Sequence, residues 1–219
     1  MSSNSILRRL VLLGTPLVTA IFMLFHPSPY SDLAGELVPI AGWWTAIHTI
    51  QFVLFAFMGA AVWMLTDGLR GAAATSSKVA AIIFAIFYDI GDAVAGISTG
   101  ILAGRAAGAP AAEQTALIGG AEALFQSSVK NLAFAVGINA WAVALIAAAV
   151  ALFFAGAPRV PLFLLALPVY FISFDHAFPF GSLTFGFFFV AALWLELARP
   201  KPVPGKEETY PDASEAEMG

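Results

Sequence analysis

Five side chains of the kinds that bind metal ions or move protons fall within long apolar stretches of the chain. They are three histidines and two aspartates: His26, His48, His176, Asp89 and Asp92. Imidazoles and carboxylates are common ligands of zinc, copper and non-haem iron. Ionisable groups inside apolar segments are costly and rare, and they commonly mark functional sites. The pattern therefore indicates a site, provided that the fold brings these residues together.

The two aspartates lie three residues apart in the segment YDIGDAVAGISTG (88–100), so in a helix they share one face. Steps of four from Asp92 reach Gly96, Gly100 and Gly104. Such a stripe of small residues lets another helix approach closely. We therefore expect both aspartates to face protein rather than lipid, where each must be protonated, paired or bound to a metal.

The three histidines are expected to supply the partners of Asp92, each from a different helix. The expected metal ligands are then His26, His48, His176 and Asp92. Asp89 and Asp92 are the candidate catalytic carboxylates, one of them serving as general base. Polar neighbours of these residues form a candidate outer layer: Gln51, Tyr170, Ser173 and Asp175. No two histidines have the close helical spacing that would itself indicate a metal site.

Composition sets the environment of these residues. Of the 219 residues, 60% are hydrophobic and 11% are charged, and the mean hydropathy is +0.86. Soluble domains carry about 25% charged residues, and the apolar residues here form long runs typical of membrane spans. Because a helix satisfies its own backbone hydrogen bonds in lipid, the expected fold is an all-α, polytopic bundle in contact with the bilayer.

The apolar runs predict a six-helix bundle in one transmembrane domain, residues 1–198, followed by a disordered tail at 199–219. Residues 115–129 have a mixed pattern and are expected to form an interfacial helix or an extension of the fourth span. The expected spans are 10–25, 42–66, 78–103, 132–154, 160–178 and 181–197.

Basic residues predict the orientation. With both termini in the cytoplasm, Arg8, Arg9, Arg70, Lys78 and Arg159 fall on the cytoplasmic side together with the tail, whereas Arg105 and Lys130 fall outside. This bias follows the positive-inside rule, and it turns the histidines and aspartates toward the outer side. A cysteine-free, Ala- and Gly-rich chain is expected in a bacterial inner membrane.

Several functions fit this pattern. The favoured one is binding of a divalent transition metal, zinc or copper, or of a small polar ligand. Metal-dependent intramembrane hydrolysis is the reaction that such a site could catalyse, and enzyme activity is left open. The alternatives are a small transporter or channel with the Asp pair as cation or proton site, a non-catalytic subunit of a membrane complex, and a haem carrier. Haem is less well supported because basic partners for its propionates are scarce on the outer side. A homo-oligomer or a membrane partner is compatible with each, and no basic surface indicates nucleic-acid binding.

Overall fold

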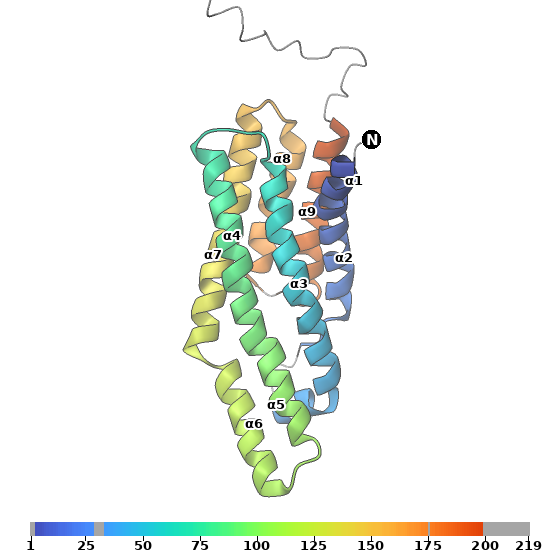
Figure 1. Ribbon diagram of the computed structural model, residues 1–219, viewed down its shortest axis with the longest axis vertical. Helices are drawn as coiled ribbons and strands as arrows, with labels where there is room; N and C mark the ends of the chain where they lie inside the picture. Colours follow the sequence, from blue (N-terminus) through green and yellow to red (C-terminus); the bar gives the residue numbers. More distant parts are fainter. Residues whose placement is uncertain (1–2, 29–32, 175, 199–219) are drawn as a thin grey trace, which may run out of the picture.

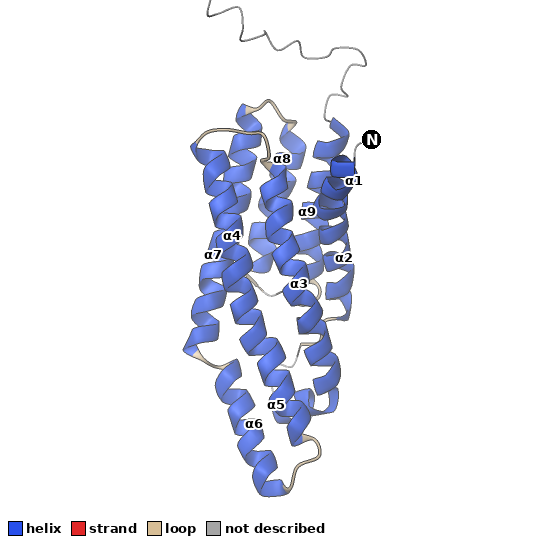
Figure 2. Ribbon diagram, viewed as in Figure 1, coloured by secondary structure: helices blue, strands red, loops and turns tan. Residues whose placement is uncertain are grey.

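The computed structural model describes residues 3–28, 33–174 and 176–198, and the predicted tail at 199–219 lies outside this part. Within the described ranges every regular element is helical and there is no strand (Figures 1 and 2). The helices run nearly side by side along one long axis. The expected all-α fold is confirmed for this part of the chain.

The first half of the chain forms three long helical segments. The first consists of α1 (Ser3–Arg9), η1 (Leu10–Gly14), α2 (Thr15–Phe22) and η2 (Met23–Phe25). The second consists of η3 (Leu33–Leu37), η4 (Val38–Ile40) and α3 (Ala41–Leu65). The third consists of α4 (Ala72–Asp92), the π-helical η5 (Ala93–Ser98) and α5 (Thr99–Ala106).

The second half adds four helices. A short turn after α5 leads to α6 (Ala111–Phe125), and a break at Gln126 and Ser127 separates α6 from α7 (Ser128–Phe154). The mixed sequence 115–129 therefore lies mostly in α6, with the break at 126–127 and the first two residues of α7 at its end. The chain then forms a helical pair, α8 (Arg159–Ile172) and α9 (Phe180–Ala198).

Five of these segments are long and apolar enough to cross a membrane: Ile6–Phe25, Ala34–Leu65, Ala72–Ala106, Ala111–Phe154 and Phe180–Ala198. The predicted fifth span, 160–178, is shorter than expected, because α8 has only 14 residues. Three-residue turns close its C-terminal end, with Ser173 N–H donating to Tyr170 O and Phe174 N–H to Phe171 O. A helix of 14 residues is about 21 Å long, less than the roughly 30 Å of a bilayer core.

The molecule has two different ends. The terminal end, at the top of Figure 1, carries Ser3, Ala198 and the turns at 66–71 and 155–158. The hairpin end, at the bottom, carries α5, α6 and the beginning of α3, which extend beyond α2, α8 and α9. Where the shorter helices stop, roughly midway along the bundle, the chain turns at 26–28 and, among the described residues, at 173–174 and 176–179. His26 and His176 lie in these two turns.

Aromatic side chains fill the core between α3, α4, α7 and α9. Phe55, Phe84, Tyr88, Trp141 and Phe185 are each at most 1% exposed, and their ring centroids lie 4.6 Å apart for Phe84 and Trp141 and 4.8 Å apart for Phe55 and Tyr88. Aromatic pairs at such separations contribute about 0.5–1.5 kcal/mol beyond the burial of their area. Most large apolar side chains outside this core are exposed on the bundle's surface, as expected for contact with lipid.

An ion pair joins the first and last helices at the terminal end. Arg8 donates to Glu196 over 2.6 Å, and a second guanidinium nitrogen of Arg8 donates to the Met64 carbonyl. The side chain of Glu196 is only 8% exposed. Because charge-assisted hydrogen bonds strengthen in surroundings of low dielectric constant, this contact holds α1 against α9 and the end of α3.

Glycine at position 137 allows α7 to pack directly on α4. A Cβ atom there would lie 2.9 Å from the backbone nitrogen of Tyr88 and 3.0 Å from its Cα. Real side chains do not tolerate these contacts, and the obstacle is backbone, which cannot rotate away. Close approach of α4 and α7 therefore depends on Gly137.

We predict that Gly137→Ala lowers the thermal midpoint in detergent. Overpacking costs about 1–3 kcal/mol, which for a chain of this length corresponds to about 2–12 °C. Gly119→Ala is the matched control, because a Cβ on Gly119 in α6 meets nothing within 4 Å and alanine favours the helix. Equal shifts in the two variants would contradict the packing account.

Candidate metal centre

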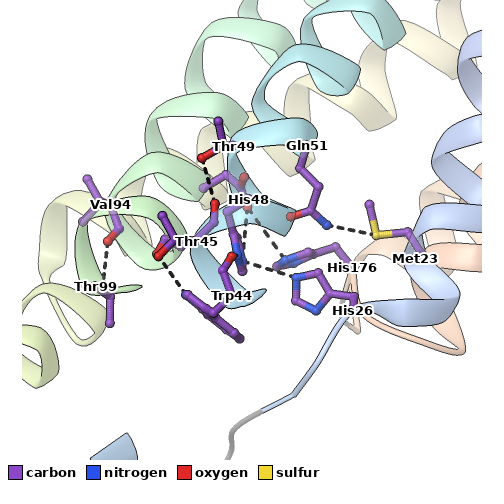
Figure 3. A network of polar contacts seen from close by, with 12 residues as sticks. Met23, His26, Trp44, Thr45, His48, Thr49, Gln51, Val94, Thr99 and His176 are labelled. Atoms are coloured by element: carbon purple, nitrogen blue, oxygen red, sulfur yellow. Dashed lines mark hydrogen bonds and ion pairs between the residues drawn. The ribbon is translucent and has the colours of Figure 1, made fainter. Parts of the chain in front are cut away.

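The three histidines converge from three separate segments (Figure 3), and Asp92 lies beside them from a fourth. His26 directly follows η2, His48 lies in α3, and His176 lies in the turn between α8 and α9. Asp92 is the last residue of α4. The ring centroid of His26 is 4.9 Å from that of His48 and 4.7 Å from that of His176. Residues 150 positions apart in the sequence thus form one cluster.

The ligand nitrogens of His26, His48 and His176 all lie within 4.8 Å of one another. The Nε2 atoms of His26 and His48 are 3.3 Å apart. Two nitrogens bound to one tetrahedral zinc ion at about 2.0–2.1 Å are themselves roughly 3.3 Å apart. The His26–His48 pair therefore has the separation of two zinc ligands, and a ligand atom of His176 lies within 4.8 Å of both.

Trp44 fixes the orientation of His48. The Nδ1–H of His48 donates to the Trp44 carbonyl oxygen over 2.7 Å, because a carbonyl can only accept. The indole packs against the imidazole with centroids 4.2 Å apart. His48 therefore presents the lone pair of Nε2 to the cluster, and a backbone acceptor on the other ring nitrogen is the usual support of a metal-binding histidine.

Trp44 and His48 of α3 pack against Gly96 and Gly100 of the third segment, as the spacing of the glycines predicts. A Cβ on Gly96 would collide with the His48 ring, and one on Gly100 would collide with the Thr45 hydroxyl and lie 2.8 Å from Trp44 Cδ1. The Nε1–H of Trp44 donates to the Gly96 carbonyl over 2.9 Å. Gly96 lies in η5, the π-helical stretch that begins directly after Asp92, and π-helical segments are frequent at functional sites.

Asp92 is completely buried on the inner side of the cluster. Its Oδ1 lies 3.9 Å from Nε2 of His48 and 3.9 Å from Nε2 of His176. Among the described residues, neither carboxylate oxygen of Asp92 has a hydrogen-bond donor. An ionised carboxylate buried without such donors is very costly, so the position favours a cation that lies between Asp92 and the imidazoles.

Asp89 occupies a less central place than Asp92. It is buried, with 7% of its surface exposed, so the expectation that both aspartates face protein is confirmed. Its Oδ1 has no hydrogen-bond donor among the described residues. Of the two carboxylates, only Asp92 lies within 4 Å of the described histidines, and Asp92 is therefore the better candidate for contact with a metal.

The residues expected to surround the site have different positions. Gln51 is fully buried, and its amide donates to the Met23 sulfur over 3.2 Å, beside His26 and His176 (Figure 3). Tyr170 is 61% exposed and its ring packs on Phe171 and Phe174. The exposed Ser173 hydroxyl donates to the Val169 carbonyl. The described contacts of these two residues are thus with their own segment, and Asp175 lies outside the described residues.

A pocket of about 150 Å³ reaches the three histidines. The turns after η2 and α8 contribute His26 and His176 to its wall, and α3 contributes Trp44 and His48. The remaining lining is mostly apolar, with Lys130 of α7 as its charged member: Pro27, Ser28, Ala95, Phe125, Lys130, Phe134 and Ala177. The cluster thus has a carboxylate on its buried side and a pocket on another side.

Sequence reasoning did not identify Trp44 and Lys130 as parts of the site. Both look interfacial by position, Trp44 at the beginning of a span and Lys130 in a mixed helix. The spacing of Trp44 and His48 by four residues was the available signal, since a side chain at i+4 can reach the carbonyl at i. For Lys130 no comparable signal exists, because its place in the pocket depends on the break between α6 and α7.

Comparison of the chain with models of protein families, with curated proteins and with solved structures finds no match. The function proposed below therefore rests on the geometry of the site.

Proposed function

We propose that this chain is a multi-pass membrane protein that holds one divalent transition-metal ion, zinc or copper, at His26, His48 and His176. The observation that carries the proposal is the convergence of three histidine ligand atoms within 4.8 Å from three separate segments. Asp92 supplies the negative charge on the buried side. The pocket side remains open for water or a small ligand.

The donor set supports zinc or copper rather than a hard cation. Imidazole suits zinc, copper, iron and nickel, whereas magnesium and calcium prefer oxygen ligands. A haem is poorly accommodated, because the pocket measures about 150 Å³ and pockets for drug-sized ligands measure about 300–1,000 Å³.

Hydrolysis is the reaction class that this arrangement would support. Zinc held by three protein ligands activates a bound water near neutral pH. The carboxylate best placed to accept a proton or orient that water is Asp92, since it lies 3.9 Å from both His48 and His176. Asp89, one turn earlier on α4, is retained as a second candidate base.

We further propose six membrane crossings, the five long segments and the shorter α8, with the terminal end of the bundle in the cytoplasm of a bacterial cell. Arg8, Arg9, Arg70, Lys78 and Arg159 lie toward that end, and the positive-inside rule then fixes the orientation. Helix α4 has 21 residues, which extend about 32 Å and match a hydrocarbon core of about 30 Å. Asp92 and the histidines would then lie near the outer boundary of the bilayer.

The metal proposal predicts one ion per chain after chelation and reloading with Co²⁺, which absorbs visible light. His48→Ala should abolish this binding, because His48 is the best-oriented of the three ligands. Asp92→Asn should weaken it about 10–100-fold, the usual effect of losing a carboxylate that supports a metal site. Metal content and the cobalt absorption spectrum of the detergent-purified protein measure both effects.

Two variants serve as controls for the metal experiment. Asp89→Asn removes a neighbouring buried carboxylate, and Ser77→Ala removes a buried polar group of α4 at a distance from the cluster. Both should retain one Co²⁺ per chain with a smaller loss of affinity than Asp92→Asn. Undiminished Co²⁺ binding by His48→Ala would contradict the proposal.

The orientation is tested with single cysteines, because the chain contains none of its own. Asp67 and Gly108 are exposed residues in turns at opposite ends of the bundle. In intact cells, a membrane-impermeant maleimide should label Gly108→Cys and should label Asp67→Cys only after permeabilisation. The reverse pattern would show that the terminal end faces outward.

A further inference from the structure

The pocket beside the three histidines has a second chemical feature, an ammonium group. Lys130 lines the same pocket as His26, His48 and His176, and among the lining residues it is the only Lys, Arg, Asp or Glu. The three histidines and Lys130 thus line one pocket of about 150 Å³.

Lys130 is positioned by a hydrogen bond at its backbone and by an aromatic ring at its side chain. Its backbone N–H donates to the Ser127 hydroxyl, which caps the first turn of α7. Its Nζ lies 4.8 Å from the centre of the Phe125 ring, a cation–π contact. The ring centroid of Phe125 in turn lies 6.5 Å from that of Trp44, the residue that orients His48. The lysine therefore belongs to the wall of the metal pocket rather than to a freely solvated surface.

The charges of the loaded site would be unbalanced without a further anion. A divalent ion, three neutral imidazoles and the Asp92 carboxylate together carry a net charge of +1. Lys130 adds one positive charge and an ionised Asp89 removes one, so the site keeps a net positive charge. In surroundings of low dielectric constant such charges interact strongly. A ligand that carries one negative charge is favoured over a neutral ligand of the same shape.

The other residues that line the pocket favour a ligand whose uncharged part is apolar. Phe134, Ala95 and Ala177 are apolar, and Phe134 stacks on His176 with centroids 6.0 Å apart. A cavity of about 150 Å³ can hold a molecule as large as benzene. Phosphate fits less well, because it offers no apolar surface to these side chains.

Building on the metal proposal, we infer that the pocket binds a carboxylate with a small apolar body, its charged group held between the metal ion and Lys130. Two sources share this chemistry, a small carboxylic acid dissolved in water and the carboxyl end of a fatty acid in the bilayer. The enclosed volume admits a ring or a few methylenes, and a longer chain must leave through the opening of the pocket.

The test uses the full chain in nonionic detergent, loaded with Co²⁺ and titrated with benzoate. Benzoate should change the cobalt absorption spectrum, and its neutral analogue benzyl alcohol should bind at least tenfold more weakly. Lys130→Gln should weaken benzoate binding about tenfold while it keeps one Co²⁺ per chain. Lys130→Arg should restore most of the affinity.

Titration with laurate in place of benzoate distinguishes the two sources, since the tighter binder identifies which class of carboxylate the pocket prefers.

Lys78→Gln is the matched control, because the Nζ of Lys78 also lies over an aromatic ring, 5.4 Å from the centre of Trp63, but near the other end of the bundle. Its benzoate affinity should equal that of the unaltered protein. Equal effects of Lys78→Gln and Lys130→Gln, or equal affinities for benzoate and benzyl alcohol, would overturn the inference and leave the metal proposal intact. Failure to bind Co²⁺ at all would overturn both.

Discussion

The contact between the His48 ring and the backbone at Gly96 is the constraint on which the site depends. Any Cβ at position 96 would occupy the space of the imidazole. Because α3 can approach η5 this closely, Trp44 reaches the Gly96 carbonyl and His48 lies beside Asp92. His26 and His176, in their two turns, lie against His48 and Asp92, whose positions are set by helix packing. Two of the four residues, His48 and Asp92, are thus positioned by packed helices, which favours precise metal coordination.

The buried carboxylate of Asp92 is the reason why a bound cation would stabilise this arrangement. A fully buried carboxylate with no hydrogen-bond donor among the described residues lowers stability unless a cation or a proton neutralises it. The cluster provides imidazoles on one side and a pocket on another, so an ion bound there would satisfy Asp92 and the histidines together. Metal binding would then add to the stability of the folded chain, and it would link the two turns and two helices that meet at this level of the bundle.

Much of the fold and part of the site follow from the sequence, for identifiable reasons. Long apolar runs predict the helices because lipid requires internally satisfied backbones, and the spacing of Asp92, Gly96 and Gly100 predicts a close helix partner. The end of α8 at Ile172 was not predicted, because the apolar run 160–172 continues through Phe174 and does not itself mark where the helix stops. The meeting of His26 and His176 depends on that turn. Lys130 joins the pocket through the break before α7, which the mixed sequence 115–129 did not locate.

The most direct test of the account is X-ray absorption spectroscopy at the edge of the bound metal in the detergent-purified, zinc-loaded protein. The account predicts scattering from three imidazole rings with nitrogens at about 2.0–2.1 Å, and oxygen ligands in the remaining positions. It predicts the loss of this imidazole signal in His48→Ala. A shell of oxygen atoms alone, or an unchanged spectrum in the variant, would contradict the assignment of His26, His48 and His176 as the metal site.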